Sequence, residues 1–340
     1  MSSATLREIA RRAGVSVDTA SRVLNGRNKE TWASTRERAE RIRRIAAQLD
    51  YTPNAAARAM VGKGTHLVGA LLRNAPDAPL HYLESYEAIL GLDAALDAAG
   101  YVLCLVRCSE VPTPGREGSR VFRERMLDGM VVFDSMTDAV MADVERLTPR
   151  CVFLDANVWR PENCVQRDER HAGRLAAQGL VDAGCRRLVF LELFEFEGAP
   201  HAFAERRQGA ASVARKAGLP FEQKPVVFLP GRLAEFAPRL AEMLDGGTGI
   251  LALTAGLAQF VATVAREAGR TPGRDFALAC CDENQGIRLA WPGLSRVTFD
   301  RFAMGRQAGE AMVKLLTERR GTPSCRLRGE WVPGTTAVLG

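Results

Sequence analysis

The stretch that decides the fold of the N-terminal region is residues 5–26, TLREIARRAGVSVDTASRVLNG. Thr5 and Glu8 are spaced as a capping box, which predicts a helix that begins at Thr5. Gly14 permits a tight turn, and Ser16 can cap a second helix. Two short helices joined by such a turn predict a helix-turn-helix, in which the first residues of the second helix are presented to base edges in a major groove.

A third amphipathic helix is predicted from about Thr35 to Leu49. Its apolar residues recur three and four positions apart, which is typical of a helix that buries one face. They are Ala39, Ile42, Ile45, Ala46 and Leu49, whereas Arg36, Arg38, Arg41, Arg43 and Arg44 mostly face outward. Further along, Asn54 can cap a helix of about six residues, which is too short to be stable without a partner.

Positive charge is concentrated in the same region. Residues 1–63 hold thirteen Lys or Arg and six Asp or Glu, a net charge of +7, although the whole chain carries only +6. The remaining residues therefore sum to −1. This asymmetry favours a polyanionic partner for the small N-terminal domain and a separate function for the rest of the chain. On charge alone, a solvated basic face is an equally good interpretation.

From residue 67 onward the pattern changes to short apolar runs separated by helical segments. The runs are continuous rather than alternating, which is typical of parallel strands covered by helices on both faces. They span Leu67–Leu72, Tyr101–Val106, Met130–Phe133, Cys151–Leu154, Leu188–Leu193, Val226–Leu229, Ile250–Leu253 and Phe276–Cys281. Two groups of such strands predict an α/β domain of two doubly wound lobes, with a ligand in the cleft beyond the carboxyl ends of the strands.

Composition and motif content narrow the function classes. With 340 residues and 46% hydrophobic residues, the chain can bury a sizeable core. It lacks both a secretory signal and the roughly 18 unbroken apolar residues of a membrane span, so we expect a cytoplasmic protein without membrane contact. Its 8 cysteines are scattered without CxxC spacing, which indicates buried thiols and no metal site. No catalytic or phosphate-binding motif is present, so we expect neither catalytic residues nor a cofactor.

Two groups of motif residues carry a resemblance to a known family. They are Ala10-x-x-Ala13-Gly14-Val15-Ser16-x-x-Thr19-x-Ser21-Arg22-Val23-Leu24-Asn25 and Tyr51-x-Pro53-Asn54-x-x-Ala57-Arg58. Together they resemble the headpiece of the LacI/GalR family of repressors. The resemblance implies a homodimer on a near-palindromic double-stranded DNA operator, with hinge helices that fold in the minor groove. It also implies a C-terminal domain similar to periplasmic sugar-binding proteins, and hence a transcription repressor controlled by a sugar or sugar derivative.

Carried over position by position, the resemblance assigns DNA contacts within both motifs and beside them. These contacts are Thr5, Ser16, Val17, Asp18, Thr19, Ser21, Arg22, Asn25, Asn54, Ala57, Arg58 and Met60. Among them, the principal base-reading positions are Val17, Asp18 and Arg22. The positions that hold the phosphate backbone include Thr19, Ser21 and Asn25.

The three base-reading candidates differ in their chemistry. Arg22 can donate two hydrogen bonds to guanine, and Val17 offers an apolar surface to a thymine methyl group. Asp18 can only accept, which favours a cytosine amino group, and its charge near phosphates is mildly unfavourable. Asp18 therefore suits specificity rather than affinity. The alternative is that Asp18 merely favours the N-terminus of its helix through the macrodipole.

Met60 stands where the family usually has a leucine that wedges between the central base pairs and kinks the DNA. Methionine is also an apolar wedge, although its flexibility could soften the kink. The alternative is that Met60 is a packing residue between the hinge and the core.

In the predicted C-terminal domain, the resemblance points to three polar residues of the cleft. Asp168 and Asp282 resemble aspartates of the family's ligand site, and Arg206 resembles an arginine that contacts polar groups of the ligand. Thr254 lies where relatives tend to carry an Asn-Asp pair, so the identity of the ligand is less constrained. A guanidinium group with carboxylates suits a polyhydroxylated ligand. Alternatively, Arg206 and Asp282 form an ion pair that bridges the lobes.

Two further arginines leave the charge of the ligand open. If Arg206, Arg232 and Arg301 converge, an anionic ligand such as a sugar acid or sugar phosphate is favoured. Otherwise Arg232 and Arg301 are exposed surface residues. Asp155 follows a predicted strand and could imitate half of an acid/base pair, but nothing in the sequence pairs it.

These features divide the chain into three segments. We expect residues 1–50 to form the headpiece, residues 51–65 the hinge helix and linker, and residues 66–340 the two-lobed ligand-binding and dimerisation domain. A ligand-binding receptor without a regulatory role is one rival, which the basic headpiece and the missing export signal disfavour. A sugar-metabolising enzyme is another, which a turnover assay on the purified protein would test.

Overall fold

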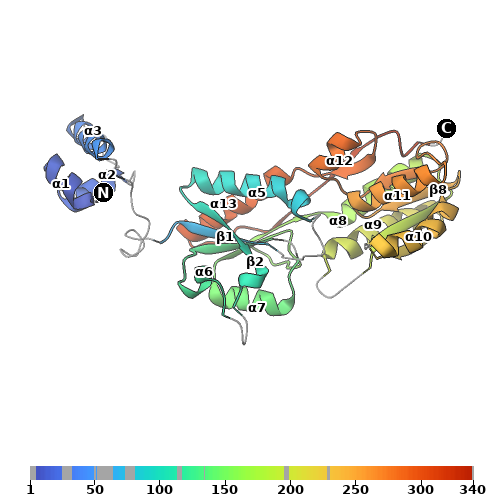
Figure 1. The fold of residues 1–340 in the computed structure, drawn as a ribbon, viewed down its shortest axis with the longest axis horizontal. Helices are drawn as coiled ribbons and strands as arrows, with labels where there is room; N and C mark the ends of the chain where they lie inside the picture. The colour runs from blue at the N-terminus through green and yellow to red at the C-terminus, as the bar shows by residue number, and fades with distance from the viewer. Residues whose placement is uncertain are drawn as a thin grey trace. The chain divides into compact units, whose positions relative to one another are not determined.

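A computed structural model describes residues 5–24, 33–49, 51, 64–72, 81–112, 117–133, 135–194, 199–227 and 230–338. The chain divides into two compact units, Met1–Thr65 and His66–Gly340. Figure 1 shows a helical first unit and a second unit built from two sheets, each flanked by helices.

The described part of the first unit contains α1 (Leu6–Ala13), α2 (Val17–Leu24) and α3 (Ala33–Gln48). Their apolar faces meet in one core, in which Ile9 and Ile42 are fully buried. The arginines of α3 that the periodicity placed outward are all exposed. The predicted helix-turn-helix with a third helix closing its core is therefore confirmed.

Local capping sets where α1 and α2 begin. Thr5 Oγ1 accepts a hydrogen bond from the backbone N–H of Glu8 at 3.3 Å, whereas the Glu8 carboxylate pairs with two arginines of the next turn. Gly14 ends α1 with a φ of 63°, in the left-handed region that a side chain would disfavour. The Ser16 hydroxyl accepts from the backbone N–H of Thr19 at 3.1 Å and so caps α2.

The second unit is built on two six-stranded sheets, which define an N lobe and a C lobe. The N-lobe sheet has the order β11-β5-β4-β3-β1-β2, and the C-lobe sheet has the order β12-β10-β9-β8-β6-β7. Neighbouring strands run parallel, but β12 is antiparallel to β10. The N-lobe strands are β1 (Leu67–Leu72), β2 (Val102–Arg107), β3 (Gly129–Phe133), β4 (Cys151–Leu154), β5 (Cys164–Arg167) and β11 (Cys325–Leu327). The C-lobe strands are β6 (Arg187–Leu193), β7 (Phe221–Val226), β8 (Thr248–Ala252), β9 (Ala277–Cys280), β10 (Ser295–Thr298) and β12 (Glu330–Val332).

Helices cover both faces of the N-lobe sheet, because separate apolar clusters form on its two sides. One side carries α5 (His81–Ala98) and α13 (Arg301–Thr317), and the other carries α6 (Arg120–Arg123) and α7 (Asp138–Leu147). In the C lobe the helices are α8 (Glu169–Asp182), α9 (His201–Ala217), α10 (Pro230–Met243), α11 (Ala255–Glu267) and α12 (Gln285–Ala290). Among the described helices, none combines the length and the apolar character that a membrane span requires.

The chain crosses between the lobes after β5, after β10 and between β11 and β12. The first of these crossings leads directly into α8, which packs on the C-lobe sheet, and the second leads into α13, which packs on the N-lobe sheet. The first residues of α8 and α13 therefore lie at the junction between the lobes.

Glycines let two helix pairs approach closely. A Cβ atom at Gly305 of α13 would lie 1.8 Å from the carbonyl oxygen of Ala88 in α5. A Cβ atom at Gly173 of α8 would lie 2.0 Å from the carbonyl oxygen of Arg206 in α9. No real side chain tolerates such distances, so these glycines fix how near α13 and α8 come to their neighbours.

The predicted class of two doubly wound α/β lobes is confirmed. The predicted runs coincide within two residues with β1 to β4, β6, β8 and β9. The run predicted at Val226–Leu229 shares only Val226 with the strand found there, the edge strand β7, in which half of the residues FEQKPV are polar, and residues 228 and 229 lie outside the described part of the chain. Strands β5, β10, β11 and β12 were not predicted, because they are three or four residues long and carry polar side chains that hide the apolar pattern.

Candidate functional site

The N-terminal end of α2 presents a mixed set of exposed side chains. Val17 is 43% exposed although it is apolar. Asp18 and Arg22, one turn apart, form an ion pair in which Nε and Oδ2 are 3.3 Å apart. The hydroxyl groups of Ser16 and Thr19 are 2.8 Å apart. This face therefore offers an apolar contact, an anionic acceptor and a cationic donor within two turns of one helix.

The remaining candidates for DNA contact differ in what the structure says of them. Thr5 is exposed at the start of α1, and Ser21 is half-buried on α2. Five others lie outside the described residues, and their roles stay predictions: Asn25, Asn54, Ala57, Arg58 and Met60.

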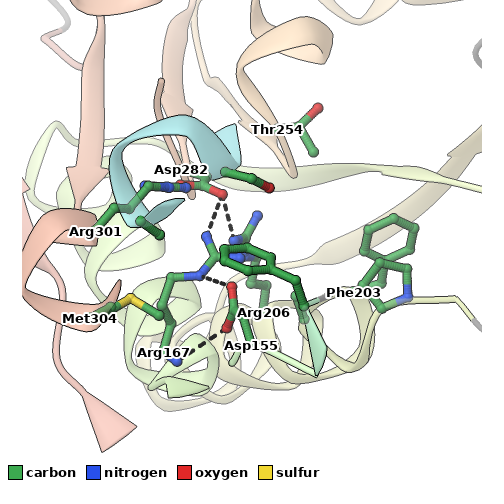
Figure 2. A pocket seen from close by; sticks show the side chains of 13 residues that line it. Asp155, Arg167, Phe203, Arg206, Thr254, Asp282, Arg301 and Met304 are labelled. Carbon is green, nitrogen blue, oxygen red and sulfur yellow. Dashed lines mark hydrogen bonds and ion pairs between the residues drawn. The ribbon is translucent and has the colours of Figure 1, made fainter. Parts of the chain in front are cut away.

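A pocket lies between the two lobes of the second unit, as Figure 2 shows. Several of its lining residues end or follow strands of both sheets. The sequence predicted the ligand cleft at this edge of the sheets. Its N-lobe side is lined by Ser85, Ala88, Phe133, Asp155, Arg167, Arg301 and Met304, and its C-lobe side by Pro200, Ala202, Phe203, Arg206, Thr254 and Asp282.

The carboxylate of Asp282, which follows β9, is the centre of the hydrogen bonding in this pocket. Its Oδ2 accepts from Arg167 at 2.7 Å and from Arg206 at 2.8 Å, and its Oδ1 accepts from Arg301 at 2.6 Å. The backbone N–H of Glu283 also donates to Oδ1, at 2.8 Å. The Asp282 side chain is only 1% exposed. Three guanidinium groups from both lobes therefore meet on one buried carboxylate.

Two other carboxylates balance the guanidinium groups. Glu169, the first residue of α8, accepts from Arg206 at 2.6 Å and 3.0 Å and lies 3.0 Å from Arg167. Asp155, which follows β4, accepts from Nε of Arg167 at 2.7 Å. Arg206 also donates to the backbone oxygen of Leu253 at 2.7 Å. The three arginines and three carboxylates form one interlobe network whose formal charges cancel.

Burial and charge oppose each other in the interlobe network. Burial raises the pKa of Asp282, but Arg301, Arg167 and Arg206 outweigh it and hold that pKa well below its ordinary value. Burial also raises the pKa of Asp155, yet nearby cations, Arg167 first, leave it below its ordinary value. The pKa of Arg206 is lowered by burial and raised more strongly by its carboxylate partners, so it ends above its ordinary value. These groups therefore stay ionised at neutral pH.

The side chains of the interlobe network occupy most of the space between the lobes. The cavity that remains has a volume of about 60 Å³. Ligand pockets are commonly roughly 300–1,000 Å³, whereas one water molecule takes about 30 Å³ of liquid. A monosaccharide therefore fits only if network side chains move or the lobes separate.

Three of the four predicted ligand residues line the pocket, namely Arg206, Thr254 and Asp282. Arg206 and Asp282 also form the ion pair that sequence analysis held as the alternative, although both belong to the C lobe. The fourth, Asp168, caps α8 by accepting from the backbone N–H of His171 at 2.9 Å, and it is not among the residues that line the pocket.

Sequence analysis did not name two members of the interlobe network, Arg167 and Glu169, which flank Asp168 at the first crossing between the lobes. The ligand contact expected of Asp168 stays a prediction. Asp155 was noticed because it follows a strand, but its partner Arg167 lies after β5, a strand that was not predicted. In the structure β5 pairs with β4, and this pairing brings Asp155 and Arg167 together. A prediction of β5 from the sequence would have placed the two residues side by side.

Of the three arginines whose convergence the sequence left open, two meet in the pocket. Arg301 is buried in the pocket together with Arg206. Arg232 lies exposed on α10 and pairs with Glu235 at 2.9 Å, so it belongs to the surface. The third guanidinium group of the pocket is that of Arg167.

The cysteines are free thiols, and five of the eight are buried. Burial raises the pKa of Cys151 and of Cys281 to about 12, and that of Cys185 to about 11. These thiols therefore stay protonated at neutral pH. In the ranges that the structure describes, no group of His, Cys, Asp and Glu side chains could hold a metal ion.

Comparison with known proteins matches both parts of the chain. Residues 5–54 match the family described as bacterial regulatory proteins, lacI family, and residues 177–337 match the periplasmic binding protein-like domain. The chain therefore carries a LacI-family DNA-binding domain and a periplasmic binding protein-like domain. The exposed face of α2 lies inside the first match, and Arg206, Thr254 and Asp282 lie inside the second.

Full-length relatives agree with this assignment. The chain is 28% identical over 329 residues to the HTH-type transcriptional regulator GntR of Pseudomonas aeruginosa, with 92% of this chain and 89% of the relative covered. Other relatives, such as CelR of Thermobifida fusca, are also named as transcriptional regulators, which agrees with the lacI-family match at residues 5–54.

Solved structures show the same fold. The Lac repressor dimer bound to operator and the anti-inducer ONPF has a TM-score of 0.75 at 19% identity, with 99% of this chain and 100% of that chain covered. The complex of the transcriptional regulator CelR with cellobiose has a TM-score of 0.64 at 21% identity, with 98% and 99% covered. The shared fold is a helix-turn-helix domain joined to two parallel-sheet α/β lobes.

Proposed function

We propose that this protein is a cytoplasmic repressor that binds a near-palindromic operator as a homodimer and responds to a carbohydrate-like ligand between its two lobes. The observation that carries the proposal is the exposed N-terminal face of α2, within a helix-turn-helix that matches the LacI family. The net charge of +7 in residues 1–63 supplies the attraction to DNA phosphates.

The α2 face suits reading of base edges. The ion pair between Arg22 and Asp18 is exposed, with side chains 55% and 73% accessible, so it contributes little to stability. Arg22 can therefore exchange Asp18 for the two acceptors of a guanine, which leaves Asp18 to accept from a cytosine amino group. Val17 contacts a thymine methyl group in this arrangement. Hydroxyl groups of Thr5, Ser16, Thr19 and Ser21, together with Asn25, hold the phosphate backbone.

The hinge completes the DNA-binding element in this proposal. Residues 51–65 supply a hinge helix of about six residues and a linker, and the helix forms only on DNA, since so few residues cannot hold a helix alone. Asn54 caps it, Ala57 and Arg58 face the DNA, and Met60 wedges between base pairs of the minor groove. If Met60 serves only for packing, its replacement by Ala leaves the bend of the operator unchanged.

The interlobe pocket is the proposed effector site. Guanidinium groups and carboxylates form directed hydrogen bonds with hydroxyl groups, so sugar hydroxyls can replace the bonds that the network makes to itself. The solved complex of CelR with cellobiose supports a carbohydrate in this fold. A sugar acid is the second candidate, because Arg167, Arg206 and Arg301 all reach the pocket and a ligand carboxylate can compete with Asp282 for them.

Effector control follows from where the network lies. Glu169 and Arg301 are the first residues of α8 and α13, the helices that begin at the crossings between the lobes. A ligand that separates these charges favours a different angle between the lobes. It therefore shifts the population of the form that holds the two headpieces at operator spacing.

A homodimer is needed for a palindromic operator, because two α2 helices must enter major grooves about 34 Å apart. Exposed apolar side chains on neighbouring elements of the N lobe support self-association. They are Tyr86 and Leu90 on α5, and Val102 and Leu105 on the edge strand β2, with exposed fractions of 53%, 41%, 59% and 59%. The solved Lac repressor is a dimer on its operator.

The DNA half of the proposal is tested by selection from a random duplex library with the full-length protein at low salt. We expect an enriched near-palindrome and a binding constant that falls steeply with salt, by about 0.9 in the log–log slope for each phosphate contacted. Enrichment of no sequence would overturn the assignment as an operator-binding regulator.

The ligand half is tested by thermal-shift measurements with sugars and with the acids derived from them, since a bound ligand raises stability by mass action. A hit must then change the affinity for the selected operator. A hit that leaves operator affinity unchanged would indicate a receptor without regulation. Turnover of a hit would indicate an enzyme.

A further inference from the structure

A second cavity lies wholly within the N lobe, away from the interlobe network. It is bounded by α13, by the start of β5 and by the segment that joins α13 to β11. Its volume of about 270 Å³ exceeds the roughly 60 Å³ of the interlobe pocket. Its lining consists of Asn163, Cys164, Val165, Gln307, Glu310, Ala311, Lys314, Thr322, Pro323 and Cys325.

One face of α13 forms a wall of this cavity. Gln307, Glu310, Ala311 and Lys314 are three, four and seven positions apart, so they share one side of the helix. The opposite side packs through Gly305 and Gly309 against α5. Packing against α5 therefore fixes the orientation of α13, and the polar face of α13 lies towards the cavity.

The cavity lining contains hydrogen-bond donors that the protein does not use. Lys314 has no ion-pair or hydrogen-bond partner for its ammonium group in the part of the chain that the structure describes. The hydroxyl of Thr322 is buried and also lacks a partner among the described residues. Gln307 accepts from the Cys325 thiol through its Oε1, at 3.3 Å, which leaves its NH₂ group free to donate. A buried polar group without a partner is costly, so a ligand that supplies acceptors is favoured here.

Two hydrogen bonds of the Thr322 backbone to Asn163 fix the position of Thr322. Its N–H donates to Oδ1 of Asn163 at 2.9 Å, and its carbonyl oxygen accepts from the N–H of Asn163 at 2.7 Å. Asn163 itself has a φ of 64°, in the left-handed region. The two residues therefore lock the loop against the start of β5, with the hydroxyl of Thr322 enclosed.

The charges around the cavity favour an anion. Glu310 is the acidic member of the lining, and its carboxylate is engaged by Arg306 at 3.1 Å. Lys314 is then the uncompensated charge of the wall, and the exposed Arg319 and Arg320 follow on the same loop. The apolar part of the lining is small, consisting of Val165, Ala311 and Pro323.

We propose that this N-lobe cavity binds a small oxyanion, either a phosphate or a carboxylate on a short apolar group. Lys314 supplies the charge, the Thr322 hydroxyl and the Gln307 amide donate to the remaining oxygens, and the apolar lining contacts the rest of the ligand. The site is separate from the effector pocket, and it does not rest on the proposed function. It shares α13 with that pocket, since Arg301 begins the helix and Lys314 lies about 20 Å further along it.

Isothermal titration calorimetry on the full-length protein tests this site, with inorganic phosphate and propionate as probes at constant ionic strength. We expect saturable binding of one probe at one site per chain, and which probe binds assigns the phosphate or the carboxylate class. Lys314→Met should weaken that binding at least about tenfold, because a charge-assisted hydrogen bond is lost. Thr322→Val, which removes only a hydroxyl, should weaken it several-fold.

Lys216→Met is the matched control, because Lys216 also lies in the last turn of a 17-residue helix, α9 in the C lobe. It should leave binding unchanged. Absence of saturable binding of both probes by the unaltered protein would overturn the proposal. Binding that persists undiminished in both Lys314→Met and Thr322→Val would also overturn it, because the anion would then lie elsewhere, for example in the interlobe pocket.

Discussion

Arg301 donates to Oδ1 of Asp282 over 2.6 Å, and this bond joins the first turn of α13, which packs in the N lobe, to the end of β9 in the C lobe. The bond between Arg167 and Oδ2 of the same carboxylate, at 2.7 Å, joins the end of β5 to the same point. Asp282 is therefore a central electrostatic link between the two lobes, in addition to the ion pair of Glu87 in α5 with Arg288 in α12 at 2.6 Å.

Asp282→Asn is expected to destabilise the second unit strongly. The substitution keeps the shape but removes the charge that three buried guanidinium groups share, and breaking a buried pair in this way typically costs about 3–5 kcal/mol. Chemical denaturation monitored by circular dichroism measures the loss. Asp138→Asn, at an exposed position in the first turn of α7, is the control and should change stability by less than about 0.5 kcal/mol. Equal losses in the two variants would contradict the central role of Asp282.

Acid should remove the contribution that the ionised Asp282 makes to the interlobe network. The pKa of Asp282 in the folded chain lies well below the unfolded value of about 3.9. The contribution of the ionised Asp282 to the free energy of unfolding is therefore complete above the unfolded pKa. It is lost as the pH falls through the folded pKa. Unfolding free energies measured from pH 6 down to pH 3 should decrease more steeply for the unaltered protein than for Asp282→Asn. Parallel pH profiles would show that this carboxylate is not the group that titrates.

Arg22→Ala is expected to separate specific from general DNA affinity. Loss of a bidentate contact to guanine should cost about 1–3 kcal/mol on the selected operator and little on random duplex. Fluorescence anisotropy titrations with both duplexes at one salt concentration make the comparison. An equal loss of affinity for the operator and for the random duplex would show that Arg22 contacts phosphate and does not read a base.

Gly305→Ala is expected to disturb the packing of α13 on α5. The added methyl group would lie 1.8 Å from the carbonyl oxygen of Ala88, which is backbone and cannot rotate away. Overpacking of this kind costs about 1–3 kcal/mol, and the thermal unfolding midpoint should fall accordingly. Gly231→Ala in α10, which meets nothing within 4 Å, should be neutral or slightly stabilising. A stable Gly305→Ala variant would show that the two helices can move apart without loss.

The N-terminal unit could be predicted closely because its rules are local. Thr5 and Ser16 cap helices through residues three positions away, and the apolar spacing of α1, α2 and α3 identifies the face of each that is buried. The long apolar strands of the lobes were found for a similar reason, since burial on both faces makes a continuous run. Short edge and crossing strands such as β5 and β11 have too few residues to carry a pattern.

By itself, the sequence determined two folding units, the helix-turn-helix and the α/β class of the lobes, and it named Arg206 and Asp282. Only the tertiary structure decided what those residues contact, because Asp282 meets partners 19, 76 and 115 positions away in the chain. It also placed Arg167 and Glu169, rather than Asp168, in the interlobe network. Local periodicity records which side of an element is buried, whereas the charges that meet in a cleft depend on sheet order and on the crossings between lobes.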